Sequence, residues 1–301
     1  MIAFLYLLTI AVWGTSWLGI QFQLGTVAPA ASVTYRFILS AAIMLALCWV
    51  MRRRTRFTLP QHGRAALQGL LLFSTNYYLI YEGSRFLPSG LVAVVFACVV
   101  IMNIAGTALL FGQPVGRRTL LGAALGLAGI TAVFWPEIAA FDLGRDGSLG
   151  LLLCLLGTLS ASLGMLTSAA NQRRGMPVLE TNAAGMAYGA LFMALYTLAA
   201  GERFGFELSA GYVLSLLFLA LFATVIGFWS YLTLVGRIGA DRAGYVTVLF
   251  PIVALLLSTW FEGFRWTPLA VAGVALVVLG NGFMLTRLGG RKPLAAAAGQ
   301  P

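Results

Sequence analysis

The stretch SLGLLLCLLGTLSASLGMLTSAA, residues 148–170, contains only apolar and small polar side chains and no charge. A helix needs roughly 20 such residues to cross the ~30 Å hydrocarbon core of a bilayer. The length of residues 148–170 and their lack of charge therefore predict a membrane-spanning helix. Comparable runs fill most of the chain, and we expect ten helices of this kind, at residues 2–22, 28–51, 65–84, 89–111, 118–136, 148–170, 181–200, 210–234, 241–261 and 267–286.

The composition excludes a soluble globular protein. Of the 301 residues, 60% are hydrophobic and 9% are charged, whereas soluble domains average roughly 45–50% apolar and about 25% charged residues. The net charge of +10 does not predict a nucleic-acid partner, because the basic residues lie in short loops between apolar runs. The three cysteines, Cys48, Cys98 and Cys154, each lie within an apolar run, which favours small buried side chains over disulfides or metal ligands.

No motif for catalysis is present. The chain has no H-E-x-x-H, G-x-S-x-G or P-loop sequence, and its single histidine, His62, lies in a basic loop. We therefore expect no enzymatic activity, no catalytic residue, no cofactor and no metal site. The partners expected are a small-molecule substrate and the lipid bilayer, with the oligomeric state left open and a monomer compatible with the sequence.

The basic residues predict the orientation in the membrane. Counting the loops alternately places 14 of the 19 Lys and Arg side chains on the side of the N-terminus, and four on the other side. The remaining one, Arg36, falls within the second span. Loops rich in Lys and Arg stay in the cytoplasm, so both termini are expected to be cytoplasmic, which requires an even number of spans.

The two halves of the chain resemble each other. Tyr78-Leu79 in the third span matches Tyr231-Leu232 in the eighth, and Gly14-Thr15 in the first matches Gly157-Thr158 in the sixth. The sequence thus predicts an all-α membrane protein in which the five-helix repeats 1–137 and 147–287 have inverted topology, followed by a disordered cytoplasmic tail at 288–301. Inverted repeats are typical of secondary transporters, with the solute site near the midplane between them.

Several motifs resemble those of a known family. Trp13-Gly14-Thr15-Ser16-Trp17 resembles the first-helix W-G-(S/T)-(S/N) signature of EamA-type transporters, which belong to the drug/metabolite transporter superfamily. Pro29, followed by Arg36-Phe37, is similar to the family's second-helix pattern, and Phe261-Glu262 to the end of its ninth helix. The resemblance spans roughly residues 5–286. It implies ten helices in two inverted five-helix repeats with cytoplasmic termini.

The same resemblance implies export of amino acids, related metabolites or toxic cations, and the aromatic-rich interior looks most like the YddG-like amino-acid exporters. The chain departs from the family pattern at Gln113, where the first repeat often has an acidic residue. The fourth span lacks the usual proline near Met102-Asn103. These departures weaken any argument from strict symmetry between the repeats.

Ionisable residues inside the membrane are costly and usually have a reason. Arg36 lies about nine residues into the second span, where it either anchors a substrate carboxylate or locks helices together through backbone carbonyls or Glu82. Glu82, at the outer end of the third span, is a further structural or gating candidate. Gly14 and Gly157 are expected hinges. The glycine pairs Gly122/Gly126 and Gly185/Gly189 are expected at close helix contacts.

Aromatic and small polar residues inside the spans predict a substrate site. A buried tyrosine hydroxyl or indole N–H needs a partner, and a cavity with apolar walls and a few polar groups provides one. Helix packing is the alternative for each of these residues. The predicted substrate-binding residues are Trp17, Asn76, Tyr78, Tyr81, Ser160, Ser162, Trp229 and Tyr245.

These features predict a secondary transporter of a bacterial inner membrane. It would export aromatic or neutral amino acids, or similar small metabolites, by alternating access through a central cavity. Helices from both halves would wall this cavity, including the first, third, sixth and eighth. The alternatives are a multidrug or cation exporter of the same superfamily and a non-transporting membrane receptor. The substrate, the direction of net flux and the energy coupling stay open at this level.

Overall fold

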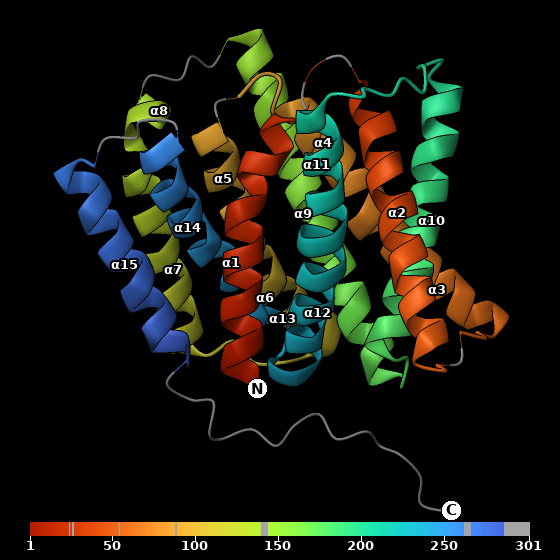
Figure 1. The fold of residues 1–301 in the computed structure, drawn as a ribbon. Coiled ribbons are helices and arrows are strands. Elements are labelled where there is room, and N and C mark those ends of the chain that lie inside the picture. Colours follow the sequence, from red (N-terminus) through yellow and green to blue (C-terminus); the bar gives the residue numbers. More distant parts are fainter. Residues whose placement is uncertain are drawn as a thin grey trace, which may run out of the picture.

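The computed structural model describes residues 1–23, 25, 27–53, 55–87, 89–139, 144–261 and 266–285. Every element in these ranges is helical, and the long helices run side by side in one bundle (Figure 1). The tail expected at 288–301 lies outside the described residues.

The first half of the chain contributes five helical rods, and the third of them is interrupted by a π-helical segment. Their bounds are α1 (Ile2–Gln21), α2 (Pro29–Val50), the continuous α3 (Leu59–Leu70), η1 (Leu71–Thr75) and α4 (Asn76–Gly83), α5 (Ser89–Ala97) with α6 (Val99–Phe111), and α7 (Arg117–Val133), followed by the short α8 (Trp135–Ala139).

The second half has the same layout. Its elements are α9 (Arg145–Arg173), α10 (Val178–Ala199), the continuous α11 (Ala210–Phe218), η2 (Leu219–Ile226) and α12 (Gly227–Ile238), the short α13 (Ala240–Ala243), α14 (Val246–Phe261) and α15 (Pro268–Leu285). Each predicted span coincides with one of these rods. Four helices in the described ranges are long and apolar enough by themselves to cross a membrane: Pro29–Val50, Val94–Phe111, Asp146–Arg173 and Ala210–Ile238.

The third rod begins six residues earlier than the apolar run predicts. Thr58 and Gln61 form a capping box, in which the Thr58 backbone N–H donates to Gln61 Oε1 at 2.8 Å, and a proline occupies the first turn. The S/T-x-x-E/Q pattern that signals such a start is present in the sequence. The helix therefore extends beyond the segment that hydropathy alone marks, because capping rather than burial decides where it begins.

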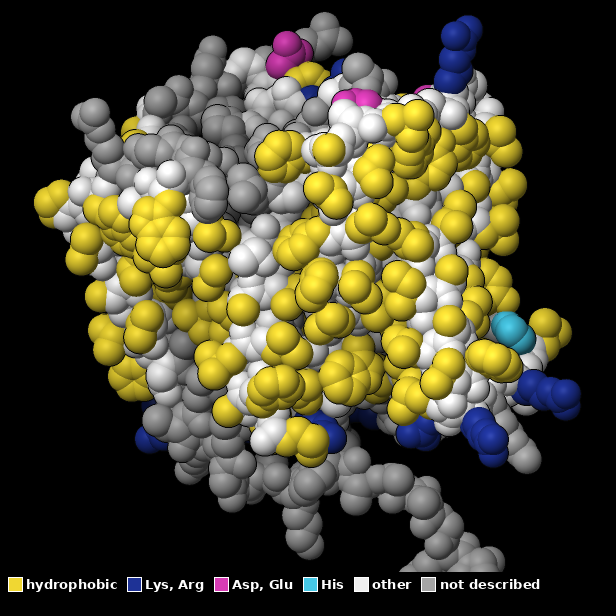
Figure 2. Space-filling view, in the orientation of Figure 1, with side chains coloured by type: hydrophobic (Ala, Val, Ile, Leu, Met, Phe, Trp, Pro, Cys, Tyr) yellow, Lys and Arg dark blue, Asp and Glu magenta, His cyan; other side chains and the backbone are white. Residues whose placement is uncertain are grey.

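The surface of the bundle is apolar around its middle. In Figure 2 hydrophobic side chains form a broad belt, while most Lys and Arg side chains gather at the lower end and Asp and Glu at the upper end. Leu109 of α6 and Trp260 of α14 are 83% and 80% exposed. A contiguous apolar belt of this size is the surface that lipid covers.

Glycines bring the helices into close contact. A Cβ atom at Gly129 of α7 would lie 2.5 Å from the Gly273 carbonyl of α15, and one at Gly273 would lie 2.6 Å from the Gly129 carbonyl. The expected close contacts of two glycine pairs are confirmed. Gly122 and Gly126 pack on Gly280 of α15, and Gly185 and Gly189 pack on α3 and η1. Small residues allow backbones in a membrane to approach closely.

Three buried amides join α3, α9 and α10. Gln68 Nε2 donates to Asn182 Oδ1 at 3.0 Å, and Asn171 Nδ2 donates to Gln68 Oε1 at 3.1 Å. All three side chains are buried. Hydrogen bonds of this kind hold helices together where apolar contacts with lipid and with protein are equally favourable.

Candidate functional site

A cavity lies between the two halves of the bundle. The volume open to the centres of water molecules is about 90 Å³, enough for several waters. All four helices that the sequence predicts for the wall contribute to it. They are α1, which is the first rod, the third rod with η1 and α4, the sixth rod α9, and the eighth rod with α12. The lining residues are Trp13, Ser16, Ile20, Arg36, Leu72, Asn76, Tyr77, Ile80, Tyr81, Phe96, Met165, Phe228 and Phe250.

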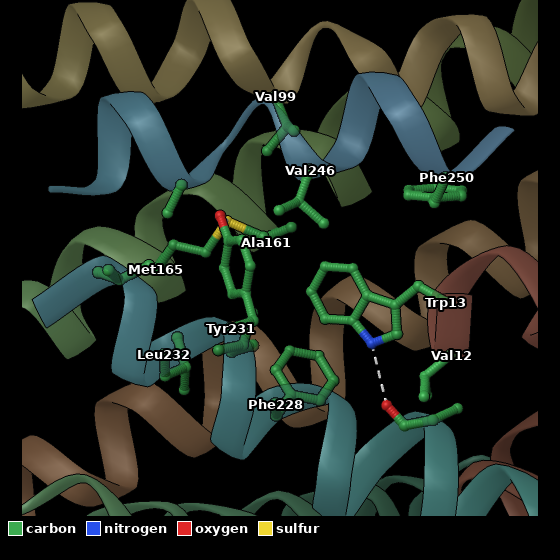
Figure 3. Close-up of a cluster of buried hydrophobic side chains, with 14 of the residues drawn as sticks. Val12, Trp13, Val99, Ala161, Met165, Phe228, Tyr231, Leu232, Val246 and Phe250 are labelled. Atoms are coloured by element: carbon green, nitrogen blue, oxygen red, sulfur yellow. Dashed lines mark hydrogen bonds between the residues drawn. The ribbon is translucent and has the colours of Figure 1, made fainter. Parts of the chain in front are cut away.

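The indole ring of Trp13 forms the aromatic centre of this wall. Its centroid lies 5.2 Å from that of Phe228, 4.8 Å from Tyr231 and 6.4 Å from Phe250. Figure 3 shows the ring between these side chains, with Nε1 directed at a backbone carbonyl of a neighbouring helix. That carbonyl belongs to Ala223, and the donor–acceptor distance is 3.0 Å. The ring is thus fixed by packing and by a hydrogen bond to η2.

The π-helical segments provide backbone acceptors next to the cavity. A π segment disturbs the regular ladder of backbone hydrogen bonds and is frequent at functional sites. Besides Trp13, Ser40 Oγ donates to the Ala220 carbonyl of η2 at 3.2 Å, and Ser160 Oγ to the Leu71 carbonyl of η1 at 2.8 Å. Both segments lie in the third rod of their half, just before the matching Tyr-Leu pairs, so the similarity of the two halves extends to this irregularity.

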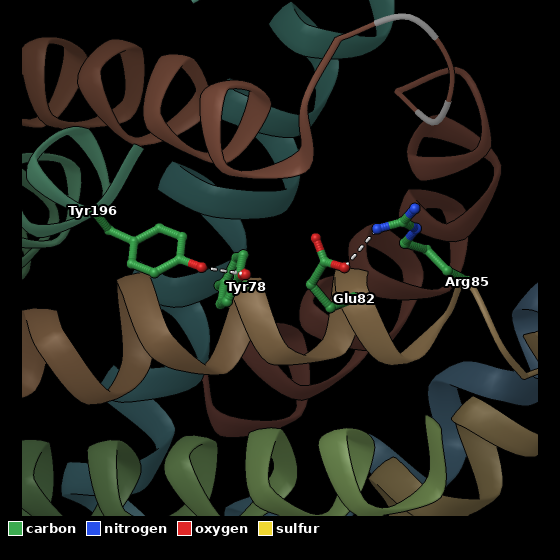
Figure 4. Close-up of polar contacts among 4 residues, drawn as sticks. All are labelled: Tyr78, Glu82, Arg85 and Tyr196. Atoms are coloured by element: carbon green, nitrogen blue, oxygen red, sulfur yellow. Dashed lines mark hydrogen bonds and ion pairs between the residues drawn. The ribbon is translucent and has the colours of Figure 1, made fainter. Parts of the chain in front are cut away.

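Arg36 is buried in the wall, with 3% of its surface exposed. Its Nε donates to Thr224 Oγ1 at 2.8 Å, and its Cζ lies 4.8 Å from the centroid of the Tyr77 ring. Within the described ranges, its Nη1 has no hydrogen-bond partner. Glu82, one of its two expected structural partners, pairs with Arg85 at 2.9 Å instead (Figure 4).

The structure brings three of the predicted site residues together. Asn76 and Tyr81 of α4 line the cavity with Arg36. Tyr81 is almost fully buried and lies beside the Arg36 guanidinium. Asn76 Nδ2 is 3.4 Å from the Leu72 carbonyl, whereas its Oδ1 has no partner among the described residues.

Two predicted aromatic residues lie away from this cavity. The Tyr78 hydroxyl shares a hydrogen bond with that of Tyr196 on α10, so its ring points out of the wall (Figure 4). Trp229 is 40% exposed on the outer surface. The side chain of Trp17 lies outside the described part of the structure.

The remaining predicted polar residues bond within the protein. Ser160 binds the η1 backbone, as described above, and Ser162 Oγ donates to Asn103 Oδ1 at 2.7 Å. The Tyr245 hydroxyl donates to the Thr119 carbonyl. The two serine contacts link α9 to η1 and to α6. The tyrosine contact links the residue before α14 to α7.

The two predicted glycine hinges are points of close packing. A Cβ atom at Gly14 would lie 2.4 Å from Val253 Cβ, and one at Gly157 would lie 3.0 Å from Ile80 Cγ1. Gly14 therefore sets the contact between α1 and α14, and Gly157 that between α9 and α4.

The sequence interpretation missed Trp13, Tyr77, Phe96, Phe228 and Phe250 as cavity residues. Helical spacing does not separate Tyr77 from Tyr78. Tyr77 lies four residues and Tyr78 three residues before Tyr81, and both spacings place a pair on one face of a helix. Nothing in the sequence separates Trp13 from Trp17 either, because the helix around them is apolar on every side.

Neighbouring tyrosines on α4 give a direct test of the cavity wall. Tyr77→Ala is expected to lower solute flux per folded molecule by about tenfold, because it removes an aromatic contact and the stacking of Arg36, together worth about 1–2 kcal/mol. Tyr78→Ala, the matched control one residue away, should keep flux near that of the wild type. Flux in liposomes, normalised to folded protein, measures both. Equal loss in the two variants would contradict this assignment of the wall.

The fold and the site define a helical, polytopic membrane protein with a cavity between two similar halves. The EamA-like transporter family model matches residues 1–135 and 148–286. The chain therefore belongs to the EamA-like transporter family and is a membrane transporter.

Two relatives agree with this assignment, and a solved structure shares the fold. The chain is 29% identical over 284 residues to the uncharacterized inner membrane transporter YedA of Escherichia coli K12, covering 90% of this chain and 88% of the relative. It is 24% identical over 285 residues to a probable amino-acid metabolite efflux pump of Salmonella typhimurium, covering 92% of each. A crystal structure with 18% identity matches with a TM-score of 0.78 over 94% of this chain and 96% of the other, which supports the fold alone.

Proposed function

We propose that this protein is a secondary transporter of the inner membrane that exports neutral or aromatic amino acids, or similar small metabolites, by alternating access through the cavity. The observation that carries the proposal is the cavity wall itself. It combines aromatic rings from both halves with a buried arginine. The printed names of two relatives, an inner membrane transporter and a probable amino-acid metabolite efflux pump, support the location and the solute class.

The same proposal includes ten membrane crossings, arranged as the inverted five-helix repeats 1–137 and 147–287, with both termini in the cytoplasm. The ten helical rods in the described ranges, the π segments at equivalent places and the family match to each half support it. The excess of basic side chains at one end of the bundle supports the orientation (Figure 2).

Reporter fusions test this topology. A reporter fused after Arg54 is expected in the cytoplasm and one fused after Asp142 in the periplasm, because the basic loops stay inside. Activity of a phosphatase, which works only outside, and fluorescence of a protein that matures only inside should report opposite sides. The same side for both fusions would refute the ten-helix arrangement.

A multidrug or cation exporter is the second candidate, and the charge of the cavity argues against it. Aromatic rings attract cations, but a positive charge in the same wall opposes them unless a carboxylate offsets it. Among the described lining residues the ionised side chain is that of Arg36, and Asp and Glu are absent. A fixed positive charge repels a cationic solute.

Transport by purified protein tests the function. Proteoliposomes are loaded in turn with the twenty amino acids and with two cationic dyes, with and without a pH gradient. We expect efflux of neutral or aromatic amino acids and no protein-dependent movement of the dyes. Movement of the dyes alone would favour the cation exporter, and the effect of the gradient would identify proton coupling.

A further inference from the structure

Two side chains in the cavity wall hold polar atoms that the protein leaves unsatisfied. Arg36 Nη1 and Asn76 Oδ1 are both buried, and neither has a hydrogen-bond partner among the described residues. Each side chain is held by another of its atoms, Arg36 through Nε to Thr224 Oγ1 at 2.8 Å and Asn76 through Nδ2 to the Leu72 carbonyl at 3.4 Å. Both residues belong to the lining of the same cavity, where Arg36 is a charged donor and Asn76 a neutral donor and acceptor.

The charge on Arg36 requires compensation. A guanidinium stays protonated in proteins, and a buried charge within a membrane is stable only with a partner. The lining residues include no acidic side chain in the described ranges, and Glu82 is paired with Arg85. The Tyr77 ring, 4.8 Å from Cζ, stabilises the cation but does not neutralise it. An anionic group on the solute would neutralise it, and a carboxylate fits the planar fork of an arginine.

The unsatisfied amide oxygen of Asn76 needs a hydrogen-bond donor, whereas Arg36 needs an anionic acceptor. Asn76 Oδ1 can accept a hydrogen bond but carries no charge, so it suits an N–H donor on the solute. An α-amino acid carries a carboxylate and an ammonium group side by side. The remaining wall is aromatic, with Trp13, Phe228 and Phe250 offering apolar surface to a side chain.

We propose that Arg36 binds the carboxylate and Asn76 the ammonium group of a zwitterionic amino acid, while the rings of Trp13, Phe228 and Phe250 receive its side chain. This inference rests on the proposed function and adds the chemical groups by which the cavity selects its solute. The transporter then rejects amines that lack the carboxylate, even when their side chain is identical. Arg36 and Asn76 are substrate-binding residues in this assignment and not only links between helices.

Binding of three probes that differ in one group tests the inference. The probes are phenylalanine, phenethylamine, which lacks the carboxylate, and 3-phenylpropionate, which lacks the ammonium group. Their dissociation constants are measured by calorimetry on the purified wild-type protein in detergent. We expect phenylalanine to bind about 10- to 100-fold more tightly than phenethylamine, since the lost contact is a hydrogen bond to a charged group. The preference over 3-phenylpropionate should be smaller, about 3- to 10-fold, because Asn76 is neutral.

Substitutions assign each preference to its residue. Arg36→Gln should weaken the binding of phenylalanine and 3-phenylpropionate but strengthen that of phenethylamine, because it removes a positive charge that repels the ammonium group. Asn76→Leu should weaken the binding of phenylalanine and phenethylamine and leave that of 3-phenylpropionate unchanged. Arg174→Gln is the matched control, because Arg174 is exposed at the end of α9 and its Nη1 bonds a carbonyl of its own helix. Arg36→Lys, which keeps the charge, should retain part of the preference for the carboxylate.

Several outcomes would overturn the inference. Equal affinity of the wild type for phenylalanine and phenethylamine would do so without any variant, and so would failure of all three probes to bind. An equal loss of all probes in Arg36→Gln, together with a lowered melting temperature, would identify Arg36 as a link between helices. The proposed function stands in each case if the proteoliposomes export amino acids, and falls separately if they move only the cationic dyes.

Discussion

Replacing Trp13 with alanine is expected to lower both the stability of the protein and its flux. The indole ring packs on Phe228, Tyr231 and Phe250, and its N–H donates to the Ala223 carbonyl of η2. Removing a large buried aromatic side chain costs about 3–5 kcal/mol. The unpaired carbonyl left in the π segment adds about 1–3 kcal/mol where water cannot reach it. We therefore expect a clear fall in the melting temperature in detergent, together with loss of flux per folded molecule.

Two further variants separate the causes. Trp13→Phe keeps an aromatic ring and removes only the donor, so it should lose much less stability than the alanine variant. Trp229→Ala is the matched control, because this tryptophan is 40% exposed on the outer surface. A normal melt and normal flux in Trp13→Ala would show that the ring is not part of the wall.

Gly14→Ala is expected to destabilise the contact between α1 and α14. The new Cβ would lie 2.4 Å from Val253 Cβ and 2.9 Å from the Phe250 carbonyl. Neither atom is the far end of a flexible side chain, so the helices themselves must move apart. Overpacking of this kind costs about 1–3 kcal/mol. The melting temperature should fall accordingly.

The same substitution at Gly63 is the control. No atom lies within 4 Å of a Cβ built at Gly63 of α3. Gly63→Ala should therefore stabilise the helix by about 0.5–1 kcal/mol, because alanine loses less backbone entropy on folding. If Gly14 acts as a hinge rather than a contact, Gly14→Ala would lower flux and leave the melting temperature unchanged.

The location of the helices could be predicted from the sequence, because apolar runs of bilayer length have few other stable conformations. In the described ranges each predicted span coincides with a helical rod, and the ends differ by a few residues. The largest difference at a helix start is at Leu59, where the capping box at Thr58 extends α3 beyond its apolar run. The π segments η1 and η2 were not predicted, since the composition of Leu71–Thr75 and Leu219–Ile226 is that of an ordinary apolar helix.

The cavity was predicted to the level of helices but not of side chains. The four helices named for its walls all contribute, and Arg36, Asn76 and Tyr81 line it. The substrate-binding residues predicted from the sequence include Tyr78 and not Tyr77. The structure instead turns Tyr77 into the cavity and Tyr78 towards Tyr196. The two residues are adjacent and chemically identical, so only the rotation of α4 about its axis distinguishes them.

The sequence by itself determined the environment of this protein, the positions of its helices and the similarity of its halves, because these follow from the length and charge of apolar runs. Tertiary structure alone decided which face of each helix meets the cavity. In water the apolar face of a helix turns inward, whereas in lipid both faces can be apolar and the hydrophobic effect does not set the rotation. Contacts between distant residues set it instead, such as Trp13 with Ala223 and Arg36 with Thr224.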